Sequence, residues 1–366
     1  MPALRASAKV FPLCDARGAL RYIIPRIMKR AAIKAISSFL PSATLTNEQL
    51  AERFEDLSAE QILSKTGIAV RHIAAKEECA SDLGVAAVEK LFATGACAPE
   101  DVDFLLFCTQ SPDYFLPTTA CVMQSRLGLK TSCGAIDFNQ GCSGYIYGLA
   151  LGKSLVESGT ATNVLLVTSD TYTRFINPRD RSLLTLFGDG AAATLISGVQ
   201  AESELIGPFI LGTDGRGANN LIVKAGGLRC PASAETAIET EDSRGNWRAE
   251  NDLYMDGAEL FNFAVKQVPE ATNQLLARAG LSRDQIDLFI LHQANRFMLE
   301  RLRGKMKIPA EKFWIEMEDG GNTVSSTIPM ALEAATRAGR VPAGSRVALV
   351  GFGVGYSWGA AMIRTL

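Results

Sequence analysis

Cys142 lies at a position where its thiol could act as a nucleophile. It follows an apolar run that predicts a buried strand ending near Asp137, and it precedes a second apolar stretch that predicts a helix running toward Ser158. Backbone N–H groups and the positive end of a helix dipole favour a thiolate, and neighbouring glycines let a carbonyl group approach. The pattern indicates acyl chemistry on a cysteine of lowered pKa, although position alone leaves open a buried, inert thiol.

His292 is the candidate catalytic imidazole. It ends the apolar run 288–291, and a polar residue at the end of a parallel strand points into the crevice above the sheet. The sequence has only 2 histidines. The other, His72, lies in a mixed segment without strand-end character, so we expect a structural role for it.

Two further positions could donate hydrogen bonds to a developing negative charge. Asn322 lies in a Gly-Gly-Asn turn before a small apolar stretch, where its amide can donate but cannot act as a base. Gly355 lies in the Gly-rich run 351–359 after a predicted buried strand, where a backbone N–H could face an oxyanion. Taken singly, each motif is also typical of a helix cap or a tight turn. For the similar run 187–191 we prefer the structural interpretation of a turn with close packing.

The elements that must hold these residues occur twice in the same order. Residues 103–108 and 287–292 each begin with an acidic residue and continue as an apolar strand. A helical stretch follows each strand, and then a turn with a special polar residue, Cys142 in one half and Asn322 in the other. Buried-strand runs come next, at 164–168 and 347–351. Alternating strands and helices predict two parallel sheets covered by helices, with both central helices between the sheets.

The duplication sets the expected domain boundaries. We predict an N-terminal half over 28–200 and a C-terminal half over 201–366, interrupted at about 229–251 by a polar surface insertion to which we assign no chemistry. The basic segment 1–27 is interpreted as a leader or as an extension from an upstream translation start. From residue 28 onward the sequence predicts a strand, a proline turn and a capped helix.

Composition excludes several classes of function. The chain has 366 residues, 47% of them hydrophobic, and a net charge of -2, which gives no overall attraction to nucleic acid or to an anionic membrane. Its 8 cysteines form no CxxC pair, so a metal site is not expected, and a reducing cytoplasm fits best. No apolar run reaches the roughly 18–20 residues needed for a transmembrane helix.

Together the motifs resemble those of β-ketoacyl-acyl-carrier-protein synthase III. The resemblance is carried by NQGCSGY (139–145), FGDGA (187–191), HQAN (292–295), GNT (321–323) and GFGVGYSWG (351–359), and it extends over 28–366 apart from the insertion. It implies the α/β thiolase fold, in which two βαβαβαββ-type halves form a five-layered α-β-α-β-α sandwich.

The resemblance also implies a two-step activity. Cys142 would take an acyl group from a coenzyme A or acyl-carrier-protein (ACP) thioester, with the backbone N–H groups of Cys142 and Gly355 holding the oxyanion. Malonyl-ACP would then lose carbon dioxide, and His292 and Asn322 would stabilise the enolate that attacks the acyl group. No metal or redox cofactor is implied.

Asparagine at the third catalytic position separates the chain from relatives with Cys-His-His or Cys-His-Cys patterns. Chalcone-synthase-like enzymes share Cys-His-Asn but fit the Gly-rich run less well. Two alternatives remain: an acyltransferase that acylates an alcohol or amine of a sugar or secondary metabolite, and a catalytically silent partner subunit.

The family's carrier-binding positions are only partly kept. By resemblance, the residues that contact substrate or carrier are Thr66, Leu116, Arg181, Phe261 and Asn295. Leu116 matches a gate that reaches the acyl pocket of the neighbouring subunit, which implies a homodimer. Gln61, Lys65 and Ala258 depart from the family pattern, which predicts a weaker grip on free coenzyme A.

A basic cluster follows the catalytic histidine. It comprises Arg296, Arg301, Arg303, Lys305 and Lys307. Because carrier proteins are typically acidic, it is a candidate ACP docking site, and the alternative is an ordinary solvated helix face.

Overall fold

The computed structural model describes residues 11–14, 20–23 and 28–366. Before residue 28 it describes only the paired strands β1 (Phe11–Cys14) and β2 (Leu20–Ile23). The interpretation of 1–27 as a leader or upstream-start extension otherwise lies outside the described residues and stays a prediction.

Two five-stranded sheets have the same internal order. In each sheet, three neighbouring strands pair in parallel. Two further strands extend the sheet at one side by antiparallel pairing. The first sheet has the order β3 (Met28–Phe39), β9 (Gly190–Ala201), β8 (Asn163–Asp170), β6 (Phe104–Cys108), β7 (Gly134–Phe138). The second has the order β10 (Ile206–Thr213), β18 (Ser357–Arg364), β17 (Arg346–Gly353), β15 (Leu288–Leu291), β16 (Phe313–Trp314). The predicted duplication is therefore confirmed.

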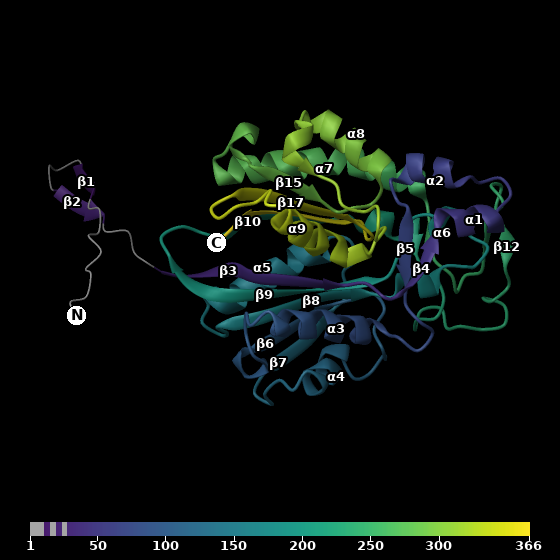
Figure 1. The fold of residues 1–366 in the computed structure, drawn as a ribbon, viewed down its shortest axis with the longest axis horizontal. Coiled ribbons are helices and arrows are strands. Elements are labelled where there is room, and N and C mark those ends of the chain that lie inside the picture. The colour runs from purple at the N-terminus through teal and green to yellow at the C-terminus, as the bar shows by residue number, and fades with distance from the viewer. Residues whose placement is uncertain (1–10, 15–19, 24–27) are drawn as a thin grey trace.

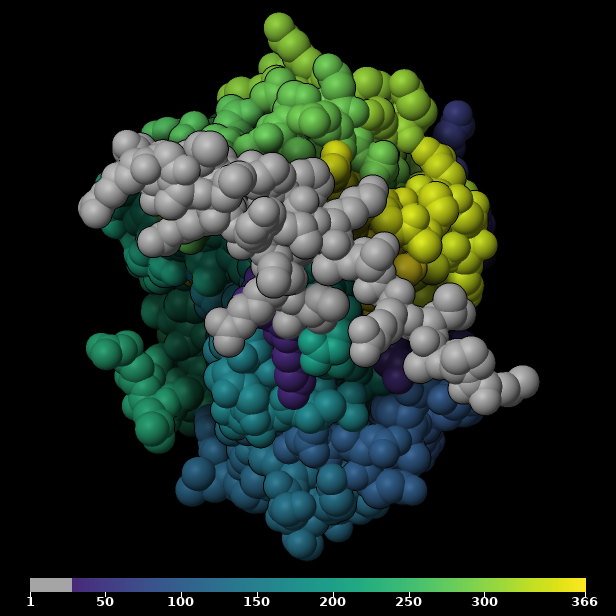
Figure 2. Space-filling model, turned by 90° about the vertical axis from the view of Figure 1, so that its left-hand side faces the viewer, coloured from purple at the N-terminus to yellow at the C-terminus, as the bar shows by residue number. Residues whose placement is uncertain are grey.

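Helices form three layers around the two sheets, as Figure 1 shows. One pair covers the outer face of the first sheet, a central pair packs between the sheets, and a third pair covers the second sheet. These pairs are α3 (Ala80–Ala93) with α4 (Thr119–Arg126), α5 (Gly144–Glu157) with α9 (Thr327–Arg337), and α7 (Gly257–Ala279) with α8 (Arg296–Met306). The predicted five-layered sandwich with both central helices buried is confirmed. Figure 2 shows the first half, in blue and teal, stacked against the green and yellow second half.

The central helix α5 packs closely because its sheet-facing residues are small. A Cβ added to Gly148 would lie 2.5 Å from a methyl group of Leu166, and one added to Gly152 would lie 2.5 Å from a methyl group of Ile196. Leu166 and Ile196 are both fully buried on the first sheet. Close packing of this kind fixes the start of α5, where Cys142 lies.

Smaller elements cover one end of the sandwich. Helix α1 begins as predicted after a proline turn, because the Thr46 side chain caps it and Gln49 completes a capping box. The remaining elements are β4 (Ala43–Thr46), α1 (Asn47–Arg53), α2 (Ala59–Thr66), β5 (Val70–Ile73), η1 (Pro99–Asp101), η2 (Tyr172–Phe175), α6 (Arg181–Leu184), η3 (Gly215–Asn220), η4 (Arg283–Gln285), η5 (Ala310–Lys312) and η6 (Val324–Ser326).

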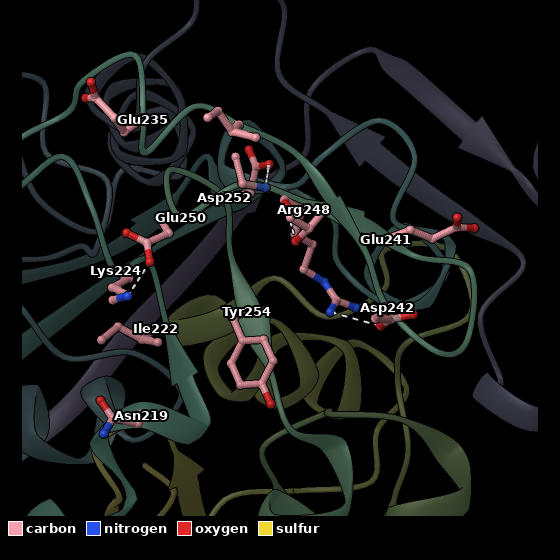
Figure 3. A pocket seen from close by; sticks show the side chains of 13 residues that line it. Asn219, Ile222, Lys224, Glu235, Glu241, Asp242, Arg248, Glu250, Asp252 and Tyr254 are labelled. Atoms are coloured by element: carbon pink, nitrogen blue, oxygen red, sulfur yellow. Dashed lines mark hydrogen bonds and ion pairs between the residues drawn. The ribbon is translucent and has the colours of Figure 1, made fainter.

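The polar insertion is an ordered excursion from a two-stranded ribbon. Strands β11 (Leu221–Ile222) and β14 (Tyr254–Met255) pair on either side of it, and within it β12 (Thr240–Glu241) pairs with β13 (Trp247–Arg248). Arg248 anchors the hairpin, since its guanidinium bonds the buried carboxylate of Asp180 and pairs with Asp242 at 3.1 Å. Figure 3 shows the pocket that this segment lines together with Lys224 and Glu250.

Candidate active site

Cys142 lies in the turn between β7 and α5, at the position that the sequence predicts. Its side chain is only 5% exposed. The end of β17 passes directly over it, because a Cβ added to Gly353 would lie 2.9 Å from the Sγ atom. Only glycine leaves room for the thiol here.

The expectation of a lowered pKa for Cys142 is wrong for the resting protein. Burial, together with the negative charge of Asp170, raises the pKa of the thiol to about 12, and hydrogen bonds from the backbone amides of Cys142 and Val354 only partly oppose this. The helix terminus is present, but loss of hydration outweighs it. The resting nucleophile is therefore a thiol at neutral pH.

The amide of Val354 is the backbone donor of the Gly-rich run that faces the thiol. It lies one residue before Gly355, the donor that the sequence suggested. Consecutive amides of this run cannot be distinguished from sequence alone, because the choice depends on how the turn after β17 folds. The role assigned to Gly355 stays a prediction.

His292 follows β15 and is 2% exposed. Its backbone N–H bonds the Val350 carbonyl at 2.8 Å, and its ring packs edge-on against Phe352 at 5.6 Å. The ring atom Nδ1 lies 2.7 Å from Oγ1 of Thr327, which leaves Nε2 for a substrate. Burial lowers the pKa of His292 to about 3, so the imidazole is neutral at physiological pH.

Asn322 is held so that its amide nitrogen can donate. Its Oδ1 atom accepts a hydrogen bond from the Val324 N–H at 3.0 Å, which leaves Nδ2 as the outward donor. Val324 has a φ of 54°, which is strained for a β-branched residue. The Asn322 backbone bonds Leu186 and Gly188 in the first half, at 2.9 and 3.1 Å.

The interpretation of the run 187–191 as a structural turn is confirmed, because a Cβ on Gly188 would lie 2.6 Å from the Gly320 carbonyl.

A continuous set of contacts links the three predicted catalytic residues. Cys142 touches Gly353. The neighbouring Phe352 packs on His292, which bonds Thr327. The Thr327 hydroxyl reaches the Val324 carbonyl at 3.1 Å, and Val324 bonds Asn322. Elements far apart in the sequence thus bring Cys142, His292 and Asn322 to one site.

Three consecutive hydroxyl residues after Asn322 were missed at the sequence level. All are buried, and each bonds a different element: Ser325 bonds Asp170, Ser326 bonds the Thr168 carbonyl and Thr327 bonds His292. Their signal is a run of polar residues at the start of an otherwise apolar helix. Asp170 was missed too, although an acidic residue at the end of an almost wholly buried strand is unusual.

Cys142 belongs to a cluster of buried apolar side chains. The other members include Leu50, Ile62, Tyr172, Leu183, Leu184, Phe187, Leu221, Leu253 and Leu260. An apolar enclosure suits an acyl chain and the arm that carries it. The pocket in the insertion has a charged lining and contains none of the three candidate catalytic residues.

The predicted carrier-binding residues fall into separate groups. Thr66 and Asn295 use their side chains locally, at the end of α2 and at the N-cap of α8. Phe261 stacks on the exposed Phe297 at 5.7 Å between rings. Arg181 is held by Asp56 and by the Arg244 carbonyl of the insertion. Leu116 lies apart from these, on the loop between β6 and α4.

The basic cluster on α8 is only partly free. Arg303 pairs with Glu300 at 2.7 Å, and Arg296 pairs with Glu318 at 3.4 Å. Arg301, Lys305 and Lys307 are exposed and form no ion pair with any residue that the structure describes.

Within the described ranges, no group of three histidine, cysteine or acidic residues could hold a metal ion. Among the described helices, none has the length and apolar character that a membrane crossing requires. The structural role expected for His72 is confirmed, because its Nδ1 atom bonds the Pro41 carbonyl at 2.5 Å.

Comparison with known proteins gives consistent matches. Residues 136–215 match the family model 3-oxoacyl-[acyl-carrier-protein] synthase III, and 276–365 match the model of its C-terminal part. A β-ketoacyl-ACP synthase III of Caldanaerobacter subterraneus is 37% identical over 334 residues, 91% of this chain and 97% of the relative.

Solved structures agree. A crystal structure of a 3-oxoacyl-ACP synthase III matches with a TM-score of 0.91 and 56% identity, covering 92% of this chain and 99% of that one. A 3-oxoacyl-ACP synthase from Burkholderia xenovorans matches with a TM-score of 0.84 and 36% identity, covering 93% and 96%.

The fold and these matches define a condensing enzyme of the thiolase fold. More narrowly, the chain belongs to the β-ketoacyl-ACP synthase III family, a ketoacyl-synthase family of fatty acid biosynthesis.

Proposed function

We propose that the enzyme first moves an acyl group onto Cys142. The sulfur attacks the carbonyl of an acyl thioester, the carbon–sulfur bond to the carrier breaks, and the thiol proton leaves with the carrier thiol. The amides of Cys142 and of the Gly-rich run, Val354 or Gly355, would hold the tetrahedral oxyanion. The Val354 amide bonded to the thiol supports this arrangement.

In the second step a malonyl thioester condenses with the acyl-enzyme. Its carboxylate leaves as carbon dioxide, and the electron pair forms a thioester enolate that His292 Nε2 and Asn322 Nδ2 stabilise as donors. The enolate carbon attacks the acyl carbonyl and releases the β-ketoacyl product from Cys142. One observation carries the proposal. Thr327 occupies Nδ1 of His292 and the Val324 N–H occupies Oδ1 of Asn322, so His292 Nε2 and Asn322 Nδ2 are left to face a substrate.

The carrier of the malonyl group is proposed to be ACP, which the relatives' names specify. The acyl donor would be a coenzyme A or ACP thioester. We further propose a cytoplasmic homodimer that needs no metal or redox cofactor, does not bind nucleic acid and does not act on a membrane.

Single-turnover mass spectrometry tests the proposal. Mixing the enzyme with an acyl thioester should add one acyl group to Cys142, and Cys142→Ala should abolish turnover. Label on Cys108 or Cys121 with Cys142 unmodified would contradict it. Product from labelled malonyl-ACP distinguishes condensation from acyl transfer to an alcohol or amine, and a complete lack of acylation would indicate a silent subunit.

The two donors are tested separately from the nucleophile. His292→Ala and Asn322→Ala should retain acylation of Cys142 but lose malonyl decarboxylation. Each substitution should remove about 3 kcal/mol of transition-state stabilisation from that step. His72→Ala removes the chain's other histidine and should leave decarboxylation unchanged in enzyme that remains folded. Normal decarboxylation in both active-site variants would refute the assignment.

A further inference from the structure

Thr327 is the side chain that contacts the nitrogen of His292 facing away from a substrate. It is the first residue of α9 and is 3% exposed. Its Oγ1 atom lies 2.7 Å from His292 Nδ1 and 3.1 Å from the Val324 carbonyl. Thr327 therefore joins the imidazole to the turn that holds Asn322.

The two contacts compete for one hydrogen. A threonine hydroxyl carries a single proton, and a neutral imidazole has one N–H and one acceptor nitrogen. If the hydroxyl donates to Val324, Nδ1 must carry the ring proton and Nε2 becomes an acceptor. If the hydroxyl donates to Nδ1, the ring proton is on Nε2, and Nε2 becomes a donor. The shorter of the two contacts is the one to Nδ1.

We infer that Thr327 is a positioning residue whose hydroxyl donates to His292 Nδ1 and so keeps the imidazole proton on Nε2. The inference rests on the proposed function, because only a neutral Nε2–H donor can stabilise the thioester enolate as described above. It adds a residue that sets which tautomer of His292 the enzyme uses. Thr327 itself does not touch the substrate.

Nitrogen NMR reads the tautomer directly in the wild-type enzyme. The chain has only 2 histidines. His72 is an internal reference, because its Nδ1 faces a carbonyl, which can only accept, and must therefore carry the proton. Long-range ¹H–¹⁵N spectra should show His72 as the Nδ1–H form and His292 as the Nε2–H form. Two Nδ1–H patterns would overturn the inference.

Variants connect the tautomer to the reaction. Thr327→Val removes the hydroxyl at nearly constant shape and should slow malonyl decarboxylation about tenfold, the size expected for one hydrogen bond, with the KM for the malonyl thioester nearly unchanged. Thr327→Ser should restore the rate and the NMR pattern. Thr272→Val is the matched control, since Thr272 is also buried on a helix and bonds the Val268 carbonyl at 2.8 Å.

Outcomes separate this inference from the proposed function. If Thr327→Val is acylated on Cys142 but decarboxylates at the wild-type rate, the role of Thr327 is wrong and the proposed function stands. If wild-type enzyme shows no acylation of Cys142, the proposed function fails first. If Thr272→Val slows decarboxylation as much as Thr327→Val, the effect is one of stability, and the inference is overturned.

Discussion

At the residue scale, the polar groups around the thiol act in opposite directions. Asp170 is fully buried at the end of β8, where Oδ1 accepts from the Gln110 N–H at 2.7 Å and Oδ2 from the Ser325 hydroxyl at 2.6 Å. It thus ties the first half to the segment after Asn322. Its charge also raises the pKa of Cys142. Burial and, to a smaller extent, the charge of this organising residue therefore hold the nucleophile in its unreactive form.

Replacing Asp170 should make the thiol more reactive. Asp170→Asn removes the charge, and its amide can still accept from Gln110 and meet the Ser325 hydroxyl. Because only the thiolate reacts with iodoacetamide, each pKa unit by which the thiol is lowered raises the rate at neutral pH about tenfold. Asp189→Asn also removes a buried carboxylate and should not change the rate. An equal increase in both variants would contradict the assignment to Asp170.

The same carboxyl should make stability depend on pH. Burial raises the pKa of Asp170 from 3.8 to about 7, so the folded state holds a proton that the unfolded state releases. The stability from this group is fully present below pH 3.8 and is lost as the pH rises through about 7. The free energy of unfolding of Asp170→Asn, relative to wild type, should rise between pH 5 and pH 8 by on the order of a few kcal/mol. If denaturant unfolding gives the same difference in free energy between Asp170→Asn and wild type at pH 5 and at pH 8, the prediction is wrong.

At the element scale, the position of Cys142 depends on how closely α5 approaches the first sheet. Gly148→Ala should lower the free energy of unfolding by about 1–3 kcal/mol, because its Cβ would overlap the buried Leu166. Gly304→Ala is the matched control: Gly304 also lies inside a helix, but a Cβ there has no atom within 4 Å. That variant should be neutral or more stable by about 0.5–1 kcal/mol. Equal thermal or denaturant shifts would contradict the packing argument.

The elements could be predicted from sequence more completely than the contacts between them. The duplicated strands were predictable because both faces of their sheets are covered, so that runs such as 104–108 and 288–291 are almost wholly apolar. Cys142, His292 and Asn322 could be proposed as catalytic candidates because each lies at the end of a strand or in a turn beside a helix. Thr327 and Asp170 were missed because their partners lie far away in the sequence, and Val354 was missed because its role depends on the fold of a glycine turn. The insertion hairpin has too little apolar patterning to predict its strands.

At the scale of the whole molecule, one exposed apolar loop is the candidate contact of the proposed homodimer. Tyr114, Phe115 and Leu116 are 61, 83 and 86% exposed, consecutive residues between β6 and α4. Such a run is costly to leave in water. The proposed homodimer would bury it against the neighbour's acyl pocket, where Leu116 would limit chain length.

Leu116 should therefore influence substrate preference. Leu116→Phe should favour shorter acyl thioesters and Leu116→Gly longer ones, measured as kcat/KM over a chain-length series. Leu228, which is 97% exposed in the insertion, provides the control, and the same two substitutions there should leave the preference unchanged. An active monomer in sedimentation, or an unchanged preference in both Leu116 variants, would contradict the proposal.

The exposed cations on and beside α8 are the residues that we expect to favour ACP over coenzyme A as the carrier. Since Arg296 and Arg303 already have acidic partners, the charges free to meet an acidic carrier protein are Arg301, Lys305 and Lys307. Opposite charges on two proteins speed their encounter, and salt weakens the effect. By the family resemblance, the departures at Gln61, Lys65 and Ala258 would also weaken the binding of free coenzyme A.

We expect ACP thioesters to be better donors than the matching coenzyme A thioesters at low salt. Arg301→Glu with Lys305→Glu should remove that advantage in kcat/KM while leaving turnover of the coenzyme A thioester intact. Lys34→Glu with Lys76→Glu makes the same change in net charge on two exposed lysines of the first half and should keep the advantage. Equal or better kcat/KM with coenzyme A in the wild-type enzyme would disprove the docking role. An equal loss in both double variants would instead attribute the advantage to net charge alone, which the docking proposal excludes.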